Sequence, residues 1–328
     1  MSVNETTLDI VLLLALPASG KSEVRRYLKS VTPEQCRADF HMGESVQLDD
    51  FPYVHLMRRI DDELEAGGRA RVYFQAGDKP FIDPRDWGTL IELVNEDYAD
   101  LVARKVATTP SAAGLLFERL DAASAAVGAP RRLAALDAGL RAALSDALEA
   151  EARALLDEKH ASYPDTLQGK TLVIEFARGG PDGSSFPLPA PFGYQYSLGR
   201  LAAPILEKAS ILYGWVTPEE SRRKNFARTD PNDPGSILHH GVPLSVMMND
   251  YGCDDMDHLE AVSAKPGTVT VTAHGRTFHL PVGRFDNRVD KSSFLRNDPA
   301  AWGADEVAAI HGGLKGALDH IARFRTGG

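Results

Sequence analysis

Apolar residues near the start of the chain form one run, residues 8–16, which is interrupted by Asp9 and followed by a turn rich in Pro, Ser and Gly. This pattern is typical of a strand that is buried on both faces of a parallel sheet. Residues 21–30 follow with the spacing of a helix. The pattern therefore predicts a strand, a tight turn and a helix.

The same alternation of short apolar runs and helical spacing continues along the chain. In residues 53–65, for example, Val54, Met57, Ile60 and Leu64 recur at helical spacing. We expect further strands at residues 45–48, 70–75, 171–176 and 209–216, further helices at residues 87–106, from 217 onward and at 302–324, and a β-hairpin from residues 268–273 and 276–282 around His274 and Gly275. These elements predict an α/β fold with a parallel sheet flanked by helices and a C-terminal β-hairpin.

Residues 111–159 differ in composition, because Ala, Leu, Arg, Asp and Glu dominate and the main break is Gly128-Ala129-Pro130. This composition predicts a helical hairpin inserted into the α/β body. We expect residues 1–110 to form the first part of the core, 111–165 the Ala-rich helical insert, and 166–328 the second part of the core with a lid, the hairpin and a C-terminal helix. The insert is expected to serve as a packing or homodimerisation element.

The overall composition excludes several classes of protein. With 43% hydrophobic and 25% charged residues in 328, the chain can bury a large core. A net charge of -10 argues against binding nucleic acid or an anionic membrane through bulk electrostatics. The two cysteines, Cys36 and Cys253, are consistent with a reducing compartment and provide no zinc framework. We expect a cytoplasmic protein, since no apolar segment reaches the roughly 20 residues of a membrane span.

The turn after the first strand has the sequence ALPASGKS, residues 15–22. It matches the phosphate-binding pattern G-x-x-x-x-G-K-[ST], with Ala15 in place of the first glycine. In such a loop the backbone N–H groups of residues 18–22 face a phosphate, Lys21 bridges phosphate oxygens and Ser22 reaches Mg²⁺. The alternative is an ordinary Gly-containing turn between strand and helix.

Three later segments extend this match. They are VQLDDF at residues 46–51, TLVIEFA at 171–177 and ILYGWVTPEESRRKNFAR at 211–228. In this order, the four segments resemble the P-loop kinases, and most of all the uridine kinase, nicotinamide riboside kinase and phosphoribulokinase group. They cover less than a third of the chain. The resemblance implies a P-loop NTPase-type sheet, ATP and Mg²⁺ as cofactors, and phosphoryl transfer to a small molecule.

The resemblance also implies roles for individual residues. Asp49 would orient or deprotonate the acceptor hydroxyl, with Asp50 as the alternative, and Glu175 would act on Mg²⁺ or bind substrate. Three arginines would reach the phosphates when residues 230–238 close as a lid: Arg222, Arg223 and Arg228. The nucleotide contacts would come from Pro17, Ala18, Ser19, Gly20, Lys21, Ser22 and Glu23.

Strand geometry supports this grouping independently of the resemblance. Ligands of an open parallel sheet bind at the carboxyl ends of the strands. Leu16, Asp49, Glu175 and Val216 all lie at predicted strand ends. We therefore expect the groups there to converge on one site.

Some of these residues have structural alternatives. Asp49 and Asp50 could cap the helix that begins near Tyr53. Glu175 could pair with Arg178. Lys224 is expected on the solvated face of its helix.

The sequence therefore favours a Mg²⁺-ATP-dependent phosphotransferase acting on a hydroxyl of a small metabolite such as a nucleoside. A second hypothesis is a nucleoside monophosphate kinase, in which Arg58 and Arg59 bind the acceptor. A third is a regulatory NTPase that acts through a protein partner bound by the insert. Specificity would depend on residues 75–87, residues 178–193 and the insert, which have no counterpart in the resemblance.

Overall fold

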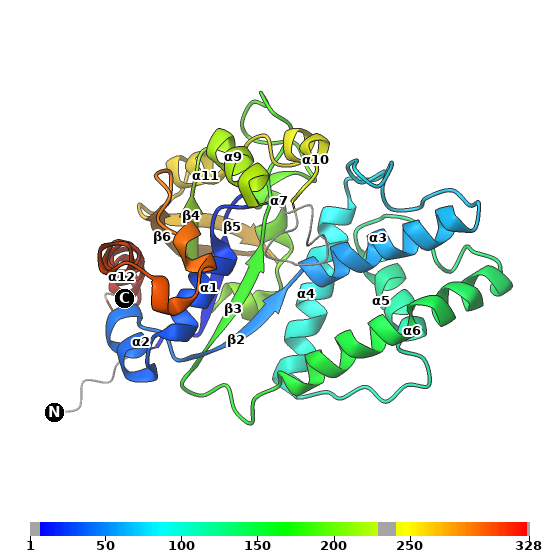
Figure 1. Cartoon of the computed structure of the whole chain (residues 1–328), viewed down its shortest axis with the longest axis horizontal. Helices are drawn as coiled ribbons and strands as arrows, with labels where there is room; N and C mark the ends of the chain where they lie inside the picture. Colours follow the sequence, from blue (N-terminus) through cyan, green and yellow to red (C-terminus); the bar gives the residue numbers. More distant parts are fainter. Residues whose placement is uncertain (1–6, 229–240, 327–328) are drawn as a thin grey trace.

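The chain folds around a single six-stranded sheet (Figure 1). This computed structural model describes residues 7–228 and 241–326. The strand order is β2 (Glu44–Asp49), β3 (Lys170–Phe176), β1 (Ile10–Leu14), β4 (Ala209–Trp215), β6 (Arg276–Asp286) and β5 (Thr268–Ala273). The first five strands are parallel and β5 is antiparallel to β6. The predicted α/β fold, parallel sheet and C-terminal hairpin are confirmed.

The centre of the sheet is formed by the strands with the longest apolar runs. All five residues of β1 are buried, and β1 pairs with both β3 and β4. In this register Leu14 lies beside Phe176 and Tyr213. The carboxyl ends of these strands therefore lie at one edge of the sheet, where the loops that follow them can meet.

Helices cover both faces of the sheet. One face carries α1 (Lys21–Ser30), α2 (Pro33–Phe40) and α12 (Ala304–Thr326), which share a core with Val11, Leu13 and Leu212. The other face packs against α4 (Asp86–Ala103), α7 (Gly193–Arg200), α8 (Ala203–Leu206) and α11 (Met256–Ala261). Within the described residues, no helix is both long enough and apolar enough to cross a membrane.

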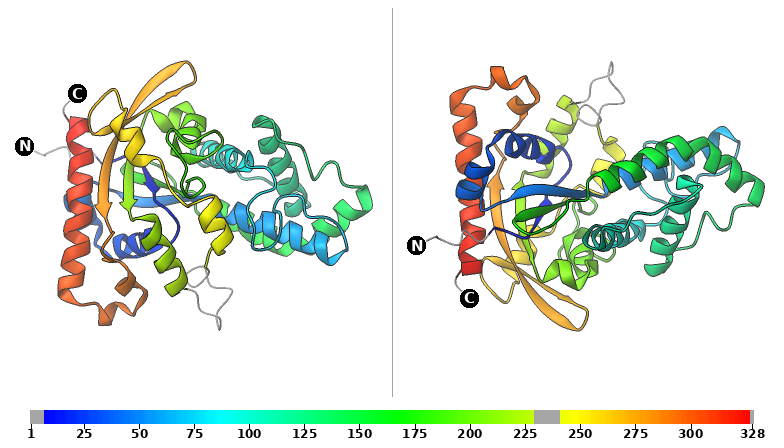
Figure 2. Two further views of the ribbon diagram at one scale, coloured as in Figure 1. Left: turned by 90° about the horizontal axis from the view of Figure 1, so that it is seen from above. Right: turned by 90° about the horizontal axis from the view of Figure 1, so that it is seen from below.

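A helical lobe extends from the β2 edge of the sheet, and we define it as α3–α6. It contains α3 (Phe51–Ala66), α4, α5 (Ala112–Ala126) and α6 (Ala138–Ala161), and these helices share a second hydrophobic core. The predicted hairpin of residues 111–159 is α5 and α6, and it packs directly on α3 and α4. Figures 1 and 2 show the helical lobe and α12 at opposite ends of the molecule.

The remaining elements are short. They are α9 (Pro218–Arg228), α10 (Leu244–Asn249) and two 3-10 helices, η1 (Ser293–Arg296) and η2 (Pro299–Ala301).

The prediction of a strand at residues 70–75 is wrong. This segment makes only an isolated bridge, between Phe74 and Phe81. Its backbone is held instead by the fully buried carboxylate of Asp61, which accepts hydrogen bonds from the N–H groups of Val72 and Phe74 at 2.7 Å each. The side chain of Asp61 thus accepts the backbone hydrogen bonds that a neighbouring strand would accept in a sheet.

Candidate functional site

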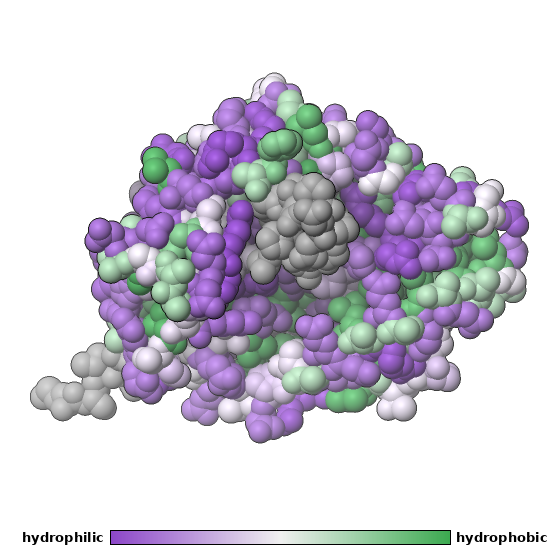
Figure 3. Space-filling view, in the orientation of Figure 1, coloured by the Kyte–Doolittle hydropathy of each residue, from purple (hydrophilic) through white to green (hydrophobic). Residues whose placement is uncertain are grey.

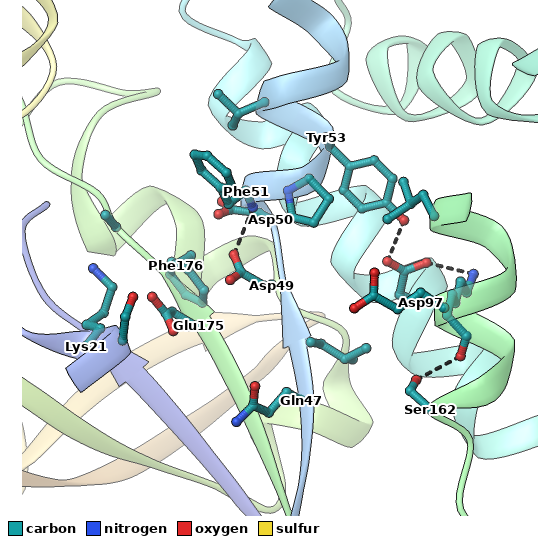
Figure 4. Close-up of a pocket in the computed structure, with 18 of the residues that line it drawn as sticks. Lys21, Gln47, Asp49, Asp50, Phe51, Tyr53, Asp97, Ser162, Glu175 and Phe176 are labelled. Carbon is teal, nitrogen blue, oxygen red and sulfur yellow. Dashed lines mark hydrogen bonds and ion pairs between the residues drawn. The ribbon is translucent and has the colours of Figure 1, made fainter. Parts of the chain in front are cut away.

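A cavity of about 1050 Å³ lies between the carboxyl edge of the sheet and the helical lobe. Its lining includes the 15–22 loop, β2, α3, α6 and the region after α10. Figure 3 shows apolar side chains in the hollow between the two parts of the molecule, and Figure 4 shows the residues at the end of β2. The volume lies at the upper end of the range of small-molecule pockets.

The 15–22 loop contains two residues with left-handed backbone. Ala18 and Gly20 adopt left-handed conformations, with φ of 56° and 99°. Such turns aim successive N–H groups into one concavity, and here α1 begins directly afterwards at Lys21. A β-carbon at Gly20 would lie 2.4 Å from Oγ of Ser292, so both the conformation and the space require glycine there.

Ala15 does not disturb this loop. The residue is fully buried and is not among the described residues with positive φ. Since its backbone conformation is open to any L-residue, glycine is not needed at this position.

The predicted nucleotide contacts mostly face the cavity. Pro17, Ala18, Gly20, Lys21 and Ser22 line it, whereas Ser19 is buried behind the loop. The ammonium of Lys21 donates to the carbonyls of Ala15 and Leu16 at 3.1 and 3.3 Å. Glu23 also lines the cavity, but its carboxylate pairs with Arg296 at 2.6 Å.

Segments from the far end of the chain hold the loop in place. Oγ of Ser221 donates to the carbonyl of Pro17 at 2.6 Å, and Nδ2 of Asn287 donates to the carbonyl of Ser19 at 2.8 Å. Lys224 supports Asn287, because its ammonium donates to the Asn287 carbonyl at 3.3 Å and pairs with Asp290 at 3.1 Å. The prediction that Lys224 lies on a solvated face is therefore wrong. Its side chain is buried, and burial lowers its pKa.

Asp49 and Glu175 lie side by side at the ends of β2 and β3 (Figure 4). Nη1 of Arg25 lies 3.4 Å from Oδ2 of Asp49 and 3.1 Å from Oε2 of Glu175. Burial, together with the charges of Glu175 and Asp50, raises the pKa of Asp49 to about 7. The Phe51 N–H and Arg25 act in the opposite direction. The carboxyl group of Asp49 can therefore accept a proton near neutral pH.

Asp50 is held differently from its neighbour. Its Oδ2 lies 2.7 Å from Nη1 of Arg178, whose side chain is only 2% exposed and packs over the rings of Trp87 and Phe176. The predicted capping of α3 is found for Asp49, which accepts a hydrogen bond from the N–H of Phe51, the first residue of α3, at 2.8 Å. The side chain of Asp50 makes no capping hydrogen bond. The alternative pairing of Arg178 with Glu175 is also not found, since Glu175 is paired with Arg25.

The predicted phosphate-binding arginines do not join this site in the part of the chain that is described. Arg222 pairs with Glu219 at 3.2 Å and Arg223 with Glu220 at 2.7 Å, and neither lines the cavity. Arg228 ends α9, and its side chain lies outside the described residues, as does the predicted lid of residues 230–238.

An ionic cluster from the helical lobe also faces the cavity (Figure 4). Asp97 accepts a hydrogen bond from the Tyr53 hydroxyl at 2.5 Å and from Arg119 at 2.6 Å, and it pairs with Lys159 at 2.7 Å. The four side chains come from α3, α4, α5 and α6, so the cluster joins these helices.

Sequence reasoning missed several residues of the cavity. They are Arg25, which binds Asp49 and Glu175, and Asp250 and Tyr251, which line the cavity. Arg178 was expected to pair with Glu175, but it binds Asp50. Arg58, expected only as a ligand of an acceptor phosphate, also lines the cavity. None of these residues belongs to a local motif, since each reaches the site through tertiary packing.

A magnesium ion requires several oxygen ligands at one place. Among the described residues, no group of three or more His, Cys, Asp or Glu side chains is arranged to hold a metal ion. Ser22 and Glu175 both line the cavity, and Oε2 of Glu175 is buried without a hydrogen bond of good geometry. This donor set fits Mg²⁺ bound in part by phosphates and water, which is how that ion usually binds to proteins.

Comparisons of the chain with protein-family models, curated proteins and solved structures found no match.

Proposed function

We propose that this protein is a Mg²⁺-ATP-dependent phosphotransferase of the P-loop kinase superfamily, nearest the uridine kinase, nicotinamide riboside kinase and phosphoribulokinase group. Its acceptor would be a hydroxyl of a small molecule bound between the sheet and the helical lobe. One observation carries the proposal: the loop bearing Lys21 and the adjacent carboxyl groups of Asp49 and Glu175 line the same cavity. Phosphoryl transfer requires a phosphate cradle and an oriented nucleophile at close quarters.

The 15–22 loop would bind the phosphates. Its N–H groups and the N-terminus of α1 supply partial positive charge, and Lys21 supplies a full charge. In this structure the ammonium of Lys21 rests on loop carbonyls, so it would turn from them to phosphate oxygens. Ser22 and Glu175 would hold Mg²⁺, which neutralises phosphate charge when it is bound.

Asp49 would act on the acceptor. Its carboxylate would accept the proton of the acceptor hydroxyl as the hydroxyl oxygen forms a bond to the γ-phosphorus and the bond to the β,γ-bridging oxygen breaks. Arg25 keeps Asp49 and Glu175 together. Asp50 is better suited to positioning, because turning it into the cavity would break its buried ion pair with Arg178.

The proposal is tested by screening ATP and Mg²⁺ with nucleosides, nucleoside monophosphates and amino alcohols, with detection of phosphorylated products by mass spectrometry. With the best acceptor, we expect Asp49→Asn to lower kcat by roughly 100-fold or more while the Kd for ATP stays the same. Lys21→Ala should weaken both ATP binding and turnover. Asp146→Asn, at an exposed position of α6, is the matched control and should behave as the wild type.

Near-normal transfer by Asp49→Asn would exclude this residue as the proton acceptor. Phosphorylation of nucleoside monophosphates instead of hydroxyl compounds would favour the monophosphate kinase hypothesis. For that hypothesis only one arginine of the predicted pair is well placed, because Arg58 lines the cavity while Arg59 pairs with Glu63 and Glu151. ATP turnover that no small acceptor changes would favour a regulatory NTPase.

A further inference from the structure

The cavity continues past Asp50 to an aromatic wall, which we define as Phe74, Phe81, Trp87 and Tyr251. Phe74 stacks on Phe81 with ring centroids 4.4 Å apart, and Phe81 meets the edge of Trp87 at 5.0 Å. Trp87 in turn contacts Tyr251 at 5.5 Å. All four line the cavity, and Trp87 also lies under the guanidinium of Arg178, the partner of Asp50. The aromatic wall is thus close to the proposed reaction centre.

Asp250 is the acidic residue of this region. It is only 5% exposed, and it lines the cavity. Its backbone N–H donates to Val246, but within the described residues its carboxylate forms no hydrogen bond or ion pair. Burial raises the pKa of Asp250 to about 7. Carboxyl groups so deeply buried nearly always have a partner, and here the cavity is where one could be provided.

Arg58 does not neutralise Asp250 by direct contact. Its Nη1 donates to the carbonyl of Gly77 at 2.8 Å, and its guanidinium lies 3.9 Å from the ring centroid of Phe74. It lowers the pKa of Asp250 from a distance, without forming an ion pair. The carboxylate is therefore left for a ligand, while the arginine is held by protein groups.

An aromatic wall beside an unpaired carboxylate has a specific chemical preference. Aromatic faces attract ammonium groups and apolar bodies, and a desolvated carboxylate accepts hydrogen bonds from N–H groups strongly. An anionic ligand would be repelled by Asp250, and it would find Arg58 already occupied. We propose that this end of the cavity binds the amino group of a small hydroxyl compound, with the nitrogen against Asp250 and the apolar body against the aromatic wall.

The role of this compound as the phosphoryl acceptor rests on the proposed function. Its binding to the cavity does not. The binding test therefore uses no nucleotide. Three para-substituted benzyl alcohols provide matched compounds: 4-(aminomethyl)benzyl alcohol, 4-methylbenzyl alcohol and 4-(hydroxymethyl)benzoate. Isothermal titration calorimetry near neutral pH is expected to show the amine binding at least about tenfold more tightly than the methyl compound, with the carboxylate weakest.

The matched variant is Asp250→Asn, which keeps the shape and removes the charge. In this variant the amine should bind at most about threefold more tightly than the methyl compound, while the affinity of the methyl compound stays the same. Asp146→Asn should retain the full preference. Equal binding of the three compounds, binding of none of them, or an undiminished preference in Asp250→Asn would overturn the proposal.

Arg58→Met provides a second test that does not depend on the folding of Asp250→Asn. Removing the opposing cation should increase the preference for the amine by about threefold. An unchanged or smaller preference would mean that the charge of Asp250 does not select the amine, and this would also overturn the proposal.

Adding ATP and Mg²⁺ separates this inference from the proposed function. An amine that binds through Asp250 but is never phosphorylated would leave the amine site intact and overturn its role as an acceptor site. Phosphorylation of the methyl compound as readily as the amine would support the kinase and overturn the role of the amine site in selecting the acceptor.

Discussion

Ala15 faces Gly214 across the pairing of β1 and β4, and a β-carbon at position 214 would lie 3.2 Å from the β-carbon of Ala15. The methyl group of Ala15 fits beside position 214 because Gly214 has no side chain. The departure from the glycine of the phosphate-loop pattern is thus compensated on the neighbouring strand.

This relationship predicts a coupled pair of substitutions. Gly214→Ala should destabilise the protein by about 1–3 kcal/mol, because two methyl groups would compete for one space in a buried sheet. The double variant Ala15→Gly, Gly214→Ala should regain most of that loss. Urea denaturation of the wild type, both single variants and the double variant measures the coupling. Strictly additive effects would show that the two residues do not compete.

The buried pair of Arg178 and Asp50 predicts a large effect on stability. Arg178→Ala should lower the free energy of unfolding by about 3–5 kcal/mol, since it leaves the Asp50 carboxylate buried without its partner. Denaturant titration monitored by tryptophan fluorescence would measure this. Arg131→Ala, at an exposed position, is the control and should change stability by less than about 0.5 kcal/mol. A comparably small change in Arg178→Ala would mean that water reaches Asp50 readily.

Asp250 predicts a pH-dependent difference in stability. Its pKa is raised to about 7 by burial and opposed by Arg58, so the folded state binds a proton more tightly than the unfolded state, where the ordinary value is 3.8. Its contribution to stability therefore falls as the pH rises between these two values, and the loss is complete above the folded-state pKa. Asp250→Asn removes this loss. The melting temperature of the variant minus that of the wild type should therefore be larger near pH 8 than near pH 5. Each kcal/mol of unfolding free energy that Asp250 costs the wild type corresponds to roughly 2–4 °C. A difference that does not change with pH would contradict the burial of a titrating Asp250.

Asn287, directly after β6, predicts a link between a late part of the chain and the 15–22 loop. Asn287→Ala removes the hydrogen bonds to the carbonyl of Ser19 and to Oγ of Ser292, each 2.8 Å long. We expect a loss of about 1–3 kcal/mol of stability. If the proposed function is right, ATP binding should also weaken. Thermal unfolding with and without ATP and Mg²⁺ would measure both effects, with exposed Gln195→Ala as the control. Unchanged stability would show that the loop keeps its conformation without this clamp.

Local sequence was enough to predict the centre of the fold. The apolar runs of β1, β3 and β4 are buried on both faces, so their pattern predicts strands of a parallel sheet. Because the carboxyl ends of parallel strands share one edge, the sequence predicted that Asp49 and Glu175 lie at the same edge of the sheet. Their direct adjacency comes from the pairing of β2 with β3.

Tertiary contacts explain what could not be predicted. Residues 70–75 have the composition of a strand, but the buried Asp61 takes up their backbone donors. The local sequence predicts that Lys224 lies on a solvated helix face. In the structure it is paired with Asp290, which is far away in the sequence. Asp250 has no local signal at all, since its importance comes from the aromatic side chains that other segments place around it.

The hydrogen bonds from Ser221 and Asn287 to the 15–22 loop also have a consequence for biosynthesis. The loop is among the first parts of the chain to leave the ribosome, whereas the residues that hold it are among the last. While the chain is still being made, the loop lacks these supports, and contacts between such distant segments form late. The loop therefore has all of these supports only after synthesis has passed residue 287.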